Sequence, residues 1–483
     1  MKSIKVALLL CPSWDSAYPI ASLALLAALL KEHGHETEVI DLNHRMAVLD
    51  RASAAVRRAP DGGTTRRGTE SKPIGADTLP SYQGWLESIV EGLSPEVRLV
   101  GFSTFQSNLE ATYAVARILK IRRPEVKIVF GGPSCLEFKE CLEHLKQDCV
   151  DAVVLGEADL SFPRLVDSLA KSGRLEAARG VLLREDPSTW KDAPPDVIED
   201  LDTLPFADFG VYGRLDTYNG LVINTTRGCI RKCVYCSDWR EMSFRCMSGR
   251  RIFDEIVHQL ERHPRQRSFM FGDPLLNSTM KELGIFCDLA IAEKLPIAWG
   301  GNAIVRPDMT PAFLAKMRAA GCLGLGYGIE SGSWRVLQTM HKYVRPELNA
   351  RVLRDTMREG IMPTALWMSG FPTETEETFL ESLDFVAANA ANIGILAITL
   401  FSIGQMEAVK DKYDLAPDAR DPYWETRDGK NTFPVRLDRL RRLMEAARAR
   451  GVGSCYHSTP QGAIHLPQLA EYERAARRQY ESR

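Results

Sequence analysis

Short apolar segments alternate with longer segments of helical periodicity through the first part of this chain. The apolar segments have strand length, and runs such as Val6–Leu10 contain no polar residue. Uninterrupted apolar runs are typical of strands buried on both faces, and helical segments supply the crossovers that parallel strands require. The expected strands are residues 4–10, 37–42, 98–103, 126–130 and 150–155, and the expected helices are residues 20–31, 108–122, 135–147 and 160–172. Residues 1–185 are therefore predicted to form an α/β domain with a flavodoxin-like, doubly wound parallel sheet, whose ligand binds at the carboxyl ends of the strands.

A second alternating series follows a proline-rich acidic segment, residues 186–218, which we interpret as an interdomain linker. Its expected strands are residues 221–226, 268–271, 297–301, 323–328, 364–369 and 395–401, and its expected helices are residues 250–262, 279–293, 311–320, 347–359 and 375–389. This series predicts a complete or partial β/α barrel over residues 219–405, with functional residues where the strands end. Residues 406–483 form a small C-terminal region with one basic amphipathic stretch and no assigned role, and residues 51–80 are expected to be a loop insertion.

Composition limits the classes of binding partner and the cellular compartment that we expect for this chain. Lys and Arg total 61 and Asp and Glu total 63, so the net charge of −2 gives no indication of nucleic-acid binding. The apolar runs near the N-terminus are shorter than the roughly 20 residues of a membrane span, so no membrane association is expected. The 11 cysteines lack the dense spacing of secreted disulfide scaffolds, which favours a reduced, cytoplasmic location.

Three cysteines are clustered just after the first expected strand of the barrel. Cys229, Cys233 and Cys236 follow a C-x3-C-x2-C spacing, and soft thiolates bind iron–sulfur clusters or zinc. Structural zinc takes four ligands, and the nearest fourth cysteine, Cys246, lies ten residues further along. The spacing favours an iron–sulfur cluster with one open metal position, with structural zinc and unrelated thiols as the alternatives.

This cysteine loop, with an aromatic residue before its last cysteine, resembles that of the radical S-adenosylmethionine (radical SAM) enzymes. The resemblance implies that the three cysteines bind a 4Fe-4S cluster, that the open iron chelates the amino and carboxylate groups of SAM, and that one electron cleaves SAM to a 5′-deoxyadenosyl radical. Three later segments match further motifs of the family in order: Phe269–Asp273, Gly328–Gly332 and Ser369–Thr375.

The same resemblance implies a set of SAM contacts: Tyr235, Gly272, Asp273, Arg306, Glu330, Ser331, Ser369 and Gly370. Tyr235, Ser369 and Gly370 are expected beside the adenine, and Gly272 and Asp273 near the amino group. Glu330 and Ser331 are expected near the ribose or the amino-acid portion. Each charged residue also has a structural interpretation. Asp273 follows a strand and would cap the next helix, Arg306 would pair with Asp308, and Glu330 would be a carboxylate held by backbone amides.

The N-terminal domain is similar to the cobalamin-binding domain that is fused to many radical SAM proteins. The expected cobalamin contacts are Ser103, Thr104, Gly131, Gly132, Gly156 and Glu157. Gly131 and Gly132 suit close approach of a large planar ligand because they have no Cβ, and Ser103 and Thr104 would bind the nucleotide tail. The segment Asp15–Ile20 lacks the histidine that ligates cobalt in some relatives. We therefore expect cobalamin without a protein nitrogen on cobalt, or else a vestigial domain.

The resemblance implies a cobalamin-dependent C-methyltransferase that acts on a natural product or peptide and receives electrons from a flavodoxin or ferredoxin. One SAM would methylate cobalamin and a second would yield the radical. The first alternative is a cyclase or rearrangement enzyme with the same cofactors. The second is a non-catalytic redox or cobalamin-responsive binding protein.

Overall fold

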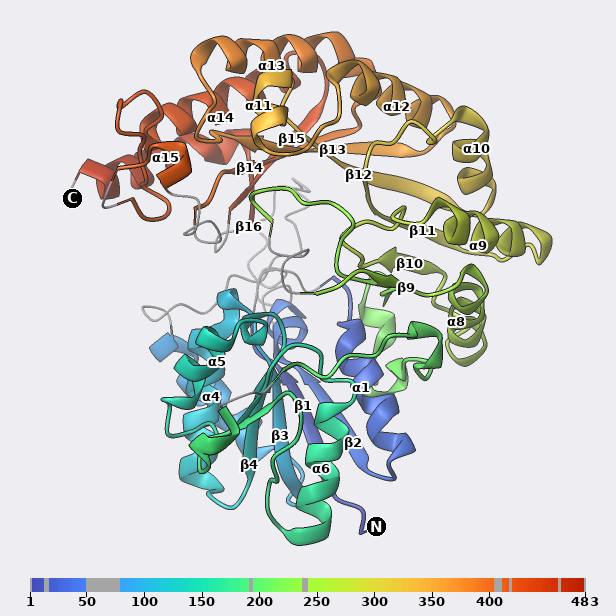
Figure 1. Ribbon diagram of the computed structural model, residues 1–483, viewed down its shortest axis with the longest axis vertical. Helices are drawn as coiled ribbons and strands as arrows, with labels where there is room; N and C mark the ends of the chain where they lie inside the picture. The colour runs from blue at the N-terminus through green and yellow to red at the C-terminus, as the bar shows by residue number, and fades with distance from the viewer. Residues whose placement is uncertain are drawn as a thin grey trace, which may run out of the picture. The chain divides into compact units, whose positions relative to one another are not determined.

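The computed structural model divides the chain into two compact units (Figure 1). The first consists mainly of residues 1–222 and the second mainly of residues 267–458 together with residues 223–254. The described residues are 2–12, 17–48, 79–190, 194–236, 242–403, 411–416, 419–458 and 462–481. Most of the insertion expected at residues 51–80 lies outside them. Within them, no helix has both the length and the apolar character that crossing a membrane requires.

The first unit contains a six-stranded sheet in the order β2-β1-β3-β4-β5-β6. Its strands are β1 (Lys5–Leu10), β2 (Glu36–Asp41), β3 (Val97–Ser103), β4 (Lys127–Gly131), β5 (Ala152–Val154) and β6 (Val181–Leu183). The first five pair in parallel, which confirms the predicted flavodoxin-like sheet. The edge strand β6 is antiparallel and was not expected, because its three residues are too few to form a pattern.

Helices cover both faces of this sheet: α1 (Ala21–Glu32), α3 (Gln83–Glu91), α4 (Leu109–Arg122), α5 (Phe138–Leu145) and α6 (Ser161–Ser172). Alternate residues of β1 enter two different cores. Leu9 packs with residues of α3, α4 and α5, whereas Leu8 and Leu10 pack with residues of α1 and α6. A strand that is buried on both faces needs apolar residues at every position, which explains the uninterrupted run.

The second unit contains an eight-stranded sheet in the order β16-β15-β14-β13-β12-β11-β10-β7, and the pairings from β10 to β15 are parallel. Its strands are β7 (Leu221–Ile223), β10 (Ser268–Phe271), β11 (Ala298–Ala303), β12 (Cys322–Glu330), β13 (Met362–Ser369), β14 (Ile395–Leu400), β15 (Gly453–Ser458) and β16 (Gly462–His465). Its helices are α8 (Gly249–Arg262), α9 (Met280–Ala292), α10 (Pro311–Ala319), α11 (Trp334–Thr339), α12 (Pro346–Arg358), α13 (Glu376–Asn389), α14 (Phe433–Arg448) and α15 (Leu466–Glu481). The end strands β7 and β16 are not neighbours in this order, so the described strands form a partial β/α barrel.

The C-terminal region extends this barrel. Helix α14 leads into β15, which pairs in parallel with β14, so the two elements form another β/α repeat. The segment Gly453–Ser458 contains no aliphatic run, so no sequence pattern predicted this strand.

Residues 201–218, within the predicted linker, pack on the first unit. Tyr212 donates a hydrogen bond to the carbonyl of Ile20 at 2.8 Å, and Tyr218 stacks on His44 with ring centroids 3.7 Å apart.

Candidate functional site

The three predicted cluster ligands lie on a loop that directly follows β8 (Thr226–Arg227), a short strand that pairs in antiparallel fashion with β9 (Arg245–Cys246). Gly228 begins the loop with φ +66°, and a Cβ there would lie 2.5 Å from the carbonyl oxygen of Met242, so only glycine fits. Cys233 is buried, Cys229 and Cys236 are partly exposed, and none is in a disulfide.

The segment after α11 holds this loop in place. The amide of Val234 donates to the carbonyl of Met340 at 3.2 Å, and the Arg231 guanidinium donates to the carbonyl of Lys342. Because residues 340–342 follow the fourth strand of the barrel and its short helix, these bonds bring the cysteine loop next to the predicted SAM contacts of that strand.

The donor set fits an iron–sulfur cluster. It provides three soft thiols within eight residues. Within the described residues, no three His, Cys, Asp or Glu side chains converge as ligands of a single metal ion. A 4Fe-4S cluster binds each cysteine through a different iron, so its ligands stand farther apart than those of one ion.

Tyr235 and Glu330 are brought together by a lysine that the sequence interpretation missed. The Lys342 ammonium lies 3.1 Å from the Glu330 carboxylate and 3.4 Å from the Tyr235 hydroxyl. The side chains of Lys342 and Glu330 are only 10% and 13% exposed. Burial and the nearby Glu330 carboxylate raise the pKa of Tyr235. A Cβ on Gly328 would lie 2.6 Å from the Lys342 ammonium, so this glycine makes room for the charge.

The backbone around this trio is unusual. Glu330 has φ +65°, and the two neighbours of Lys342, His341 and Tyr343, have φ +56° and +50°. Non-glycine residues in the left-handed region cluster at functional sites, where the surrounding structure holds them. No sequence motif identifies Lys342, because the turn that directs it inward consists of ordinary residues.

Asp273 is buried and fully hydrogen-bonded within the protein. Its carboxylate accepts bonds from the amides of Thr225 and Thr226 at 2.7 Å each and from their hydroxyls at 2.7 and 3.0 Å. Burial raises the pKa of Asp273, and these four bonds oppose the rise. The contacts join the end of β10 to the backbone that leads into the cysteine loop, and Gly272 adds an amide bond to the carbonyl of Ile223 at 2.9 Å. The predicted contact of Asp273 with SAM stays a prediction.

Arg306 pairs with Asp308, the partner that its structural interpretation predicted. It forms two bonds of 2.9 Å with Asp308 and donates to the carbonyls of Asn277 and Ser278 at 3.2 and 3.1 Å. The guanidinium lowers the pKa of Asp308.

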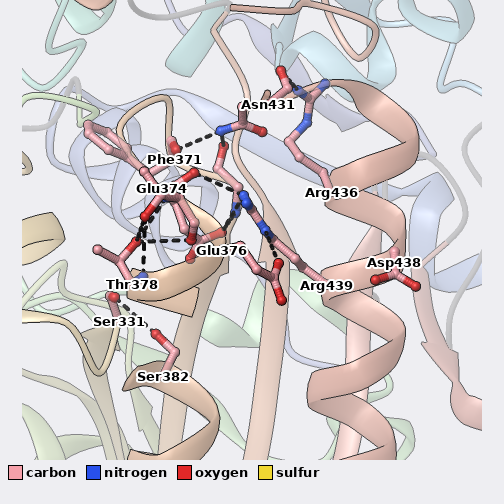
Figure 2. Close-up of polar contacts among 12 residues, drawn as sticks. Ser331, Phe371, Glu374, Glu376, Thr378, Ser382, Asn431, Arg436, Asp438 and Arg439 are labelled. Atoms are coloured by element: carbon pink, nitrogen blue, oxygen red, sulfur yellow. Dashed lines mark hydrogen bonds and ion pairs between the residues drawn. The ribbon is translucent and has the colours of Figure 1, made fainter. Parts of the chain in front are cut away.

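The remaining predicted SAM contacts lie at the ends of β12 and β13. The hydroxyl of Ser331 bonds with that of Ser382 at 3.2 Å (Figure 2). The hydroxyl of Ser369 is buried and has no hydrogen-bond partner among the described residues. Gly370 follows in the left-handed region, with φ +81°. The adenine contact expected of Ser369 and Gly370 stays a prediction.

In the first unit, Ser103 and Gly131 are neighbours at the carboxyl ends of β3 and β4. Gly131 is open, because a Cβ there would have only the Val154 side chain within 4 Å. Gly132 has φ +100°, and a Cβ there would lie 3.0 Å from the amide of Thr104 in the loop after β3, so the backbone alone already requires glycine at this position. The cobalamin contacts of both glycines stay predictions.

Gly156 and Glu157 lie in the loop after β5. Gly156 has φ +76°, donates its amide to the carbonyl of Cys135 at 2.9 Å, and would place a Cβ 2.8 Å from Pro195. Glu157 is buried. The start of the segment Asp15–Ile20, where the histidine is missing, lies outside the described residues.

A buried hydrogen-bond chain supports these loop ends, and no sequence pattern indicated it. The Tyr113 hydroxyl lies 2.6 Å from Nδ1 of His144, whose Nε2 lies 3.0 Å from the carbonyl of Ser134. A carbonyl only accepts, so Nε2 carries a proton. The Ser134 hydroxyl donates to that of Thr104 at 2.6 Å, which donates to the carbonyl of Gly131 at 2.8 Å.

Comparisons with family models agree with the sites described in the first and in the second unit. The model of the radical SAM superfamily matches residues 223–386, which contain the cysteine loop and the ends of β10, β12 and β13. The model of the B12 binding domain matches residues 64–166, which contain the loops after β3, β4 and β5. The chain carries a radical SAM domain and a B12 binding domain. These matches confirm the resemblance drawn from the cysteine motif and the predicted cofactors, which are a 4Fe-4S cluster, SAM and cobalamin.

Curated relatives of this chain include methyltransferases and cyclases. An uncharacterised methyltransferase of Pyrococcus horikoshii is 28% identical over 62% of this chain and 66% of its own length. An anaerobic magnesium-protoporphyrin IX monomethyl ester cyclase of Synechocystis is 24% identical over 60% of this chain and 59% of its own length. The chain thus spans about three fifths to two thirds of the length of these relatives.

A solved structure shares the fold. The radical SAM methyltransferase TsrM from Kitasatospora setae matches with a TM-score of 0.61 and 17% identity, over 82% of this chain and 72% of TsrM.

Proposed function

We propose that this protein is a cobalamin-dependent radical SAM methyltransferase that acts on a carbon centre of a natural product or peptide. The observation that carries the proposal is the buried Lys342–Glu330 pair beside the three-cysteine loop, because it supplies opposite charges for the amino-acid end of SAM. The B12 binding domain and the methyltransferase among the relatives support methyl transfer. An electron donor such as a flavodoxin or ferredoxin belongs to the same proposal.

When bound, the cluster supplies an electron to the sulfonium of SAM, and cobalamin carries a methyl group. The protein holds and orients these groups. Cys229, Cys233 and Cys236 provide the thiolates. In this proposal Lys342 would bind the SAM carboxylate and Glu330 its amino group or ribose, and Ser369 would lie beside the adenine. Fixing SAM at both ends directs the electron into one C–S bond.

Iron content tests the cluster. The anaerobically reconstituted protein is expected to hold about four irons per chain with broad brown absorption, and Cys229→Ala, Cys233→Ala and Cys236→Ala should each abolish both. Cys246→Ala is the matched control, because Cys246 lies in β9 outside the loop, and it should keep them. Loss of the cluster in Cys246→Ala, with zinc in its place, would contradict the proposal.

The fate of the SAM methyl group separates methylation from its alternatives. The main alternative, a cyclase or rearrangement enzyme, is supported by the similarity to the magnesium-protoporphyrin cyclase. With methyl-labelled SAM and a chemical reductant, a methyltransferase should retain label with its bound corrinoid and form 5′-deoxyadenosine. A cyclase should form 5′-deoxyadenosine without retaining label, and a non-catalytic binding protein should give neither product.

A further inference from the structure

The loop after β13 is held by side chains from the C-terminal region (Figure 2). The carboxylate of Glu374 accepts from the amide of Gly370 at 2.9 Å. The Asn431 amide donates to the carbonyls of Phe371 and Gly370 at 2.9 and 3.4 Å. Both backbone groups of Gly370 are therefore bound, one by its own loop and one by the segment before α14.

A buried ion pair links the same loop to α14. Nη1 of Arg439 lies 3.3 Å from Oε2 of Glu374 and donates to the carbonyl of Glu374 at 3.0 Å. The side chains are 3% and 1% exposed. Burial raises the pKa of Glu374 to about 7, although Arg439 opposes the rise. Breaking a buried pair by removing one partner leaves an uncompensated charge, so this contact strongly constrains the loop.

Arg436 closes the other side of Gly370. It is fully buried, donates to the carbonyls of Trp424 and Pro422 at 2.9 and 2.7 Å, and lies over the Trp424 ring at 3.7 Å. A Cβ on Gly370 would overlap the Arg436 side chain, so Gly370 cannot be replaced without moving α14.

The loop and its C-terminal contacts also leave polar atoms without partners. Ser369 Oγ, Glu374 Oε1 and Asn431 Oδ1 are buried and have no hydrogen-bond partner among the described residues. Two of these atoms belong to the Ser369–Glu374 loop and one to the segment before α14 that holds it, so this contact region carries hydrogen-bonding capacity that its own side chains leave unused.

We infer that Asn431 and Arg439 are positioning residues for SAM, which fix the Ser369–Glu374 loop where the adenine binds. This inference rests on the proposed function and gives the C-terminal region a role in the radical SAM site. SAM binds the loop, and the two side chains act through it.

The test compares Arg439→Met with Arg442→Met in the full-length reconstituted protein. Arg442 is the matched control, because it lies on the same helix as Arg439 but pairs with the exposed Glu376 of α13. Iron content, melting temperature and SAM affinity by isothermal titration are measured together. We expect Arg439→Met to keep its iron and to bind SAM about tenfold more weakly, with Arg442→Met unchanged. Asn431→Ala is the second variant if Arg439→Met does not fold, and it should show a smaller loss of the same kind.

A pH profile distinguishes positioning from general stability. Glu374 faces Arg439 of α14 and Glu376 of α13. Protonation removes the charge that Arg439 and the Gly370 amide contact, so SAM affinity should fall as pH drops through about 7. Glu374→Gln should lack this component of the profile. Unchanged SAM affinity in both Arg439→Met and Asn431→Ala, or identical profiles for wild type and Glu374→Gln, would overturn the inference. Absence of SAM binding by the wild-type protein would instead overturn the proposed function.

Discussion

Lys342 and Glu330 have opposite charges, and they contact each other in a largely buried site. Such a pair creates a strong local preference for a ligand with both a carboxylate and an amine, because each charge can exchange its partner for the complementary group of SAM. Glu330→Ala is expected to keep the iron content and to weaken SAM binding by about 1.5–3 kcal/mol, the value of one charged hydrogen bond. Lys342→Met should have a similar effect. Lys316→Met, which breaks the exposed pair with Asp288, is the control. Unchanged SAM affinity in Glu330→Ala, measured by titration calorimetry, would make this carboxylate a purely structural group.

Among the elements, strand β10 is linked by hydrogen bonds to the start of the cysteine loop, although the two are distant in sequence. Asp273 at its end binds the backbone and hydroxyls of Thr225 and Thr226, only a few residues before Cys229. Asp273→Ala leaves four donors of Thr225 and Thr226 without their acceptor, so the backbone just before the cysteine loop should no longer be held in place. We expect lower iron content per chain while every cysteine is still present. Asp308→Ala, which removes the exposed partner of Arg306, should load iron normally. Full iron loading of Asp273→Ala would show that the loop positions itself.

Most strands and helices around both sheets could be predicted because buried strands and amphipathic helices follow repeating patterns, whereas β6 and β15 could not, because they are short or lack an aliphatic run. The partial barrel followed from the same patterns, and the three cysteines were singled out by their spacing. Lys342, Arg436 and Arg439 could not be predicted, because a buried charge differs from a solvated one only through partners that are distant in sequence. Arg436 and Arg439 lie in a stretch that has the pattern of an ordinary basic amphipathic helix. The positive φ of Gly132 could not be predicted either, since a backbone angle of +100° leaves no pattern in a sequence.

At the scale of the whole molecule, the two units have separate cores, so their cofactors should be separable by mutation. Gly131→Leu fills the open side of the β4 loop and should abolish cobalamin retention in equilibrium dialysis while leaving iron content and SAM binding unchanged. Gly84→Leu is the control, because a Cβ at that glycine would meet nothing within 4 Å. Bound cobalamin should show no spectral sign of a protein nitrogen on cobalt. Full retention by Gly131→Leu would move the cobalamin site away from this loop.

The pairing of Glu374 with Arg439 spans 65 residues of sequence. On a growing chain, the β13 loop therefore leaves the ribosome well before the helix that fixes it. Until that region is present, Glu374 lacks its Arg439 partner and the Gly370 carbonyl lacks its hydrogen bond from Asn431. The cysteine loop, in contrast, finds its hydrogen-bond partners Met340 and Lys342 before residue 343. The residues that hold the cysteine loop are therefore all synthesised before the helix whose Arg439 holds the β13 loop.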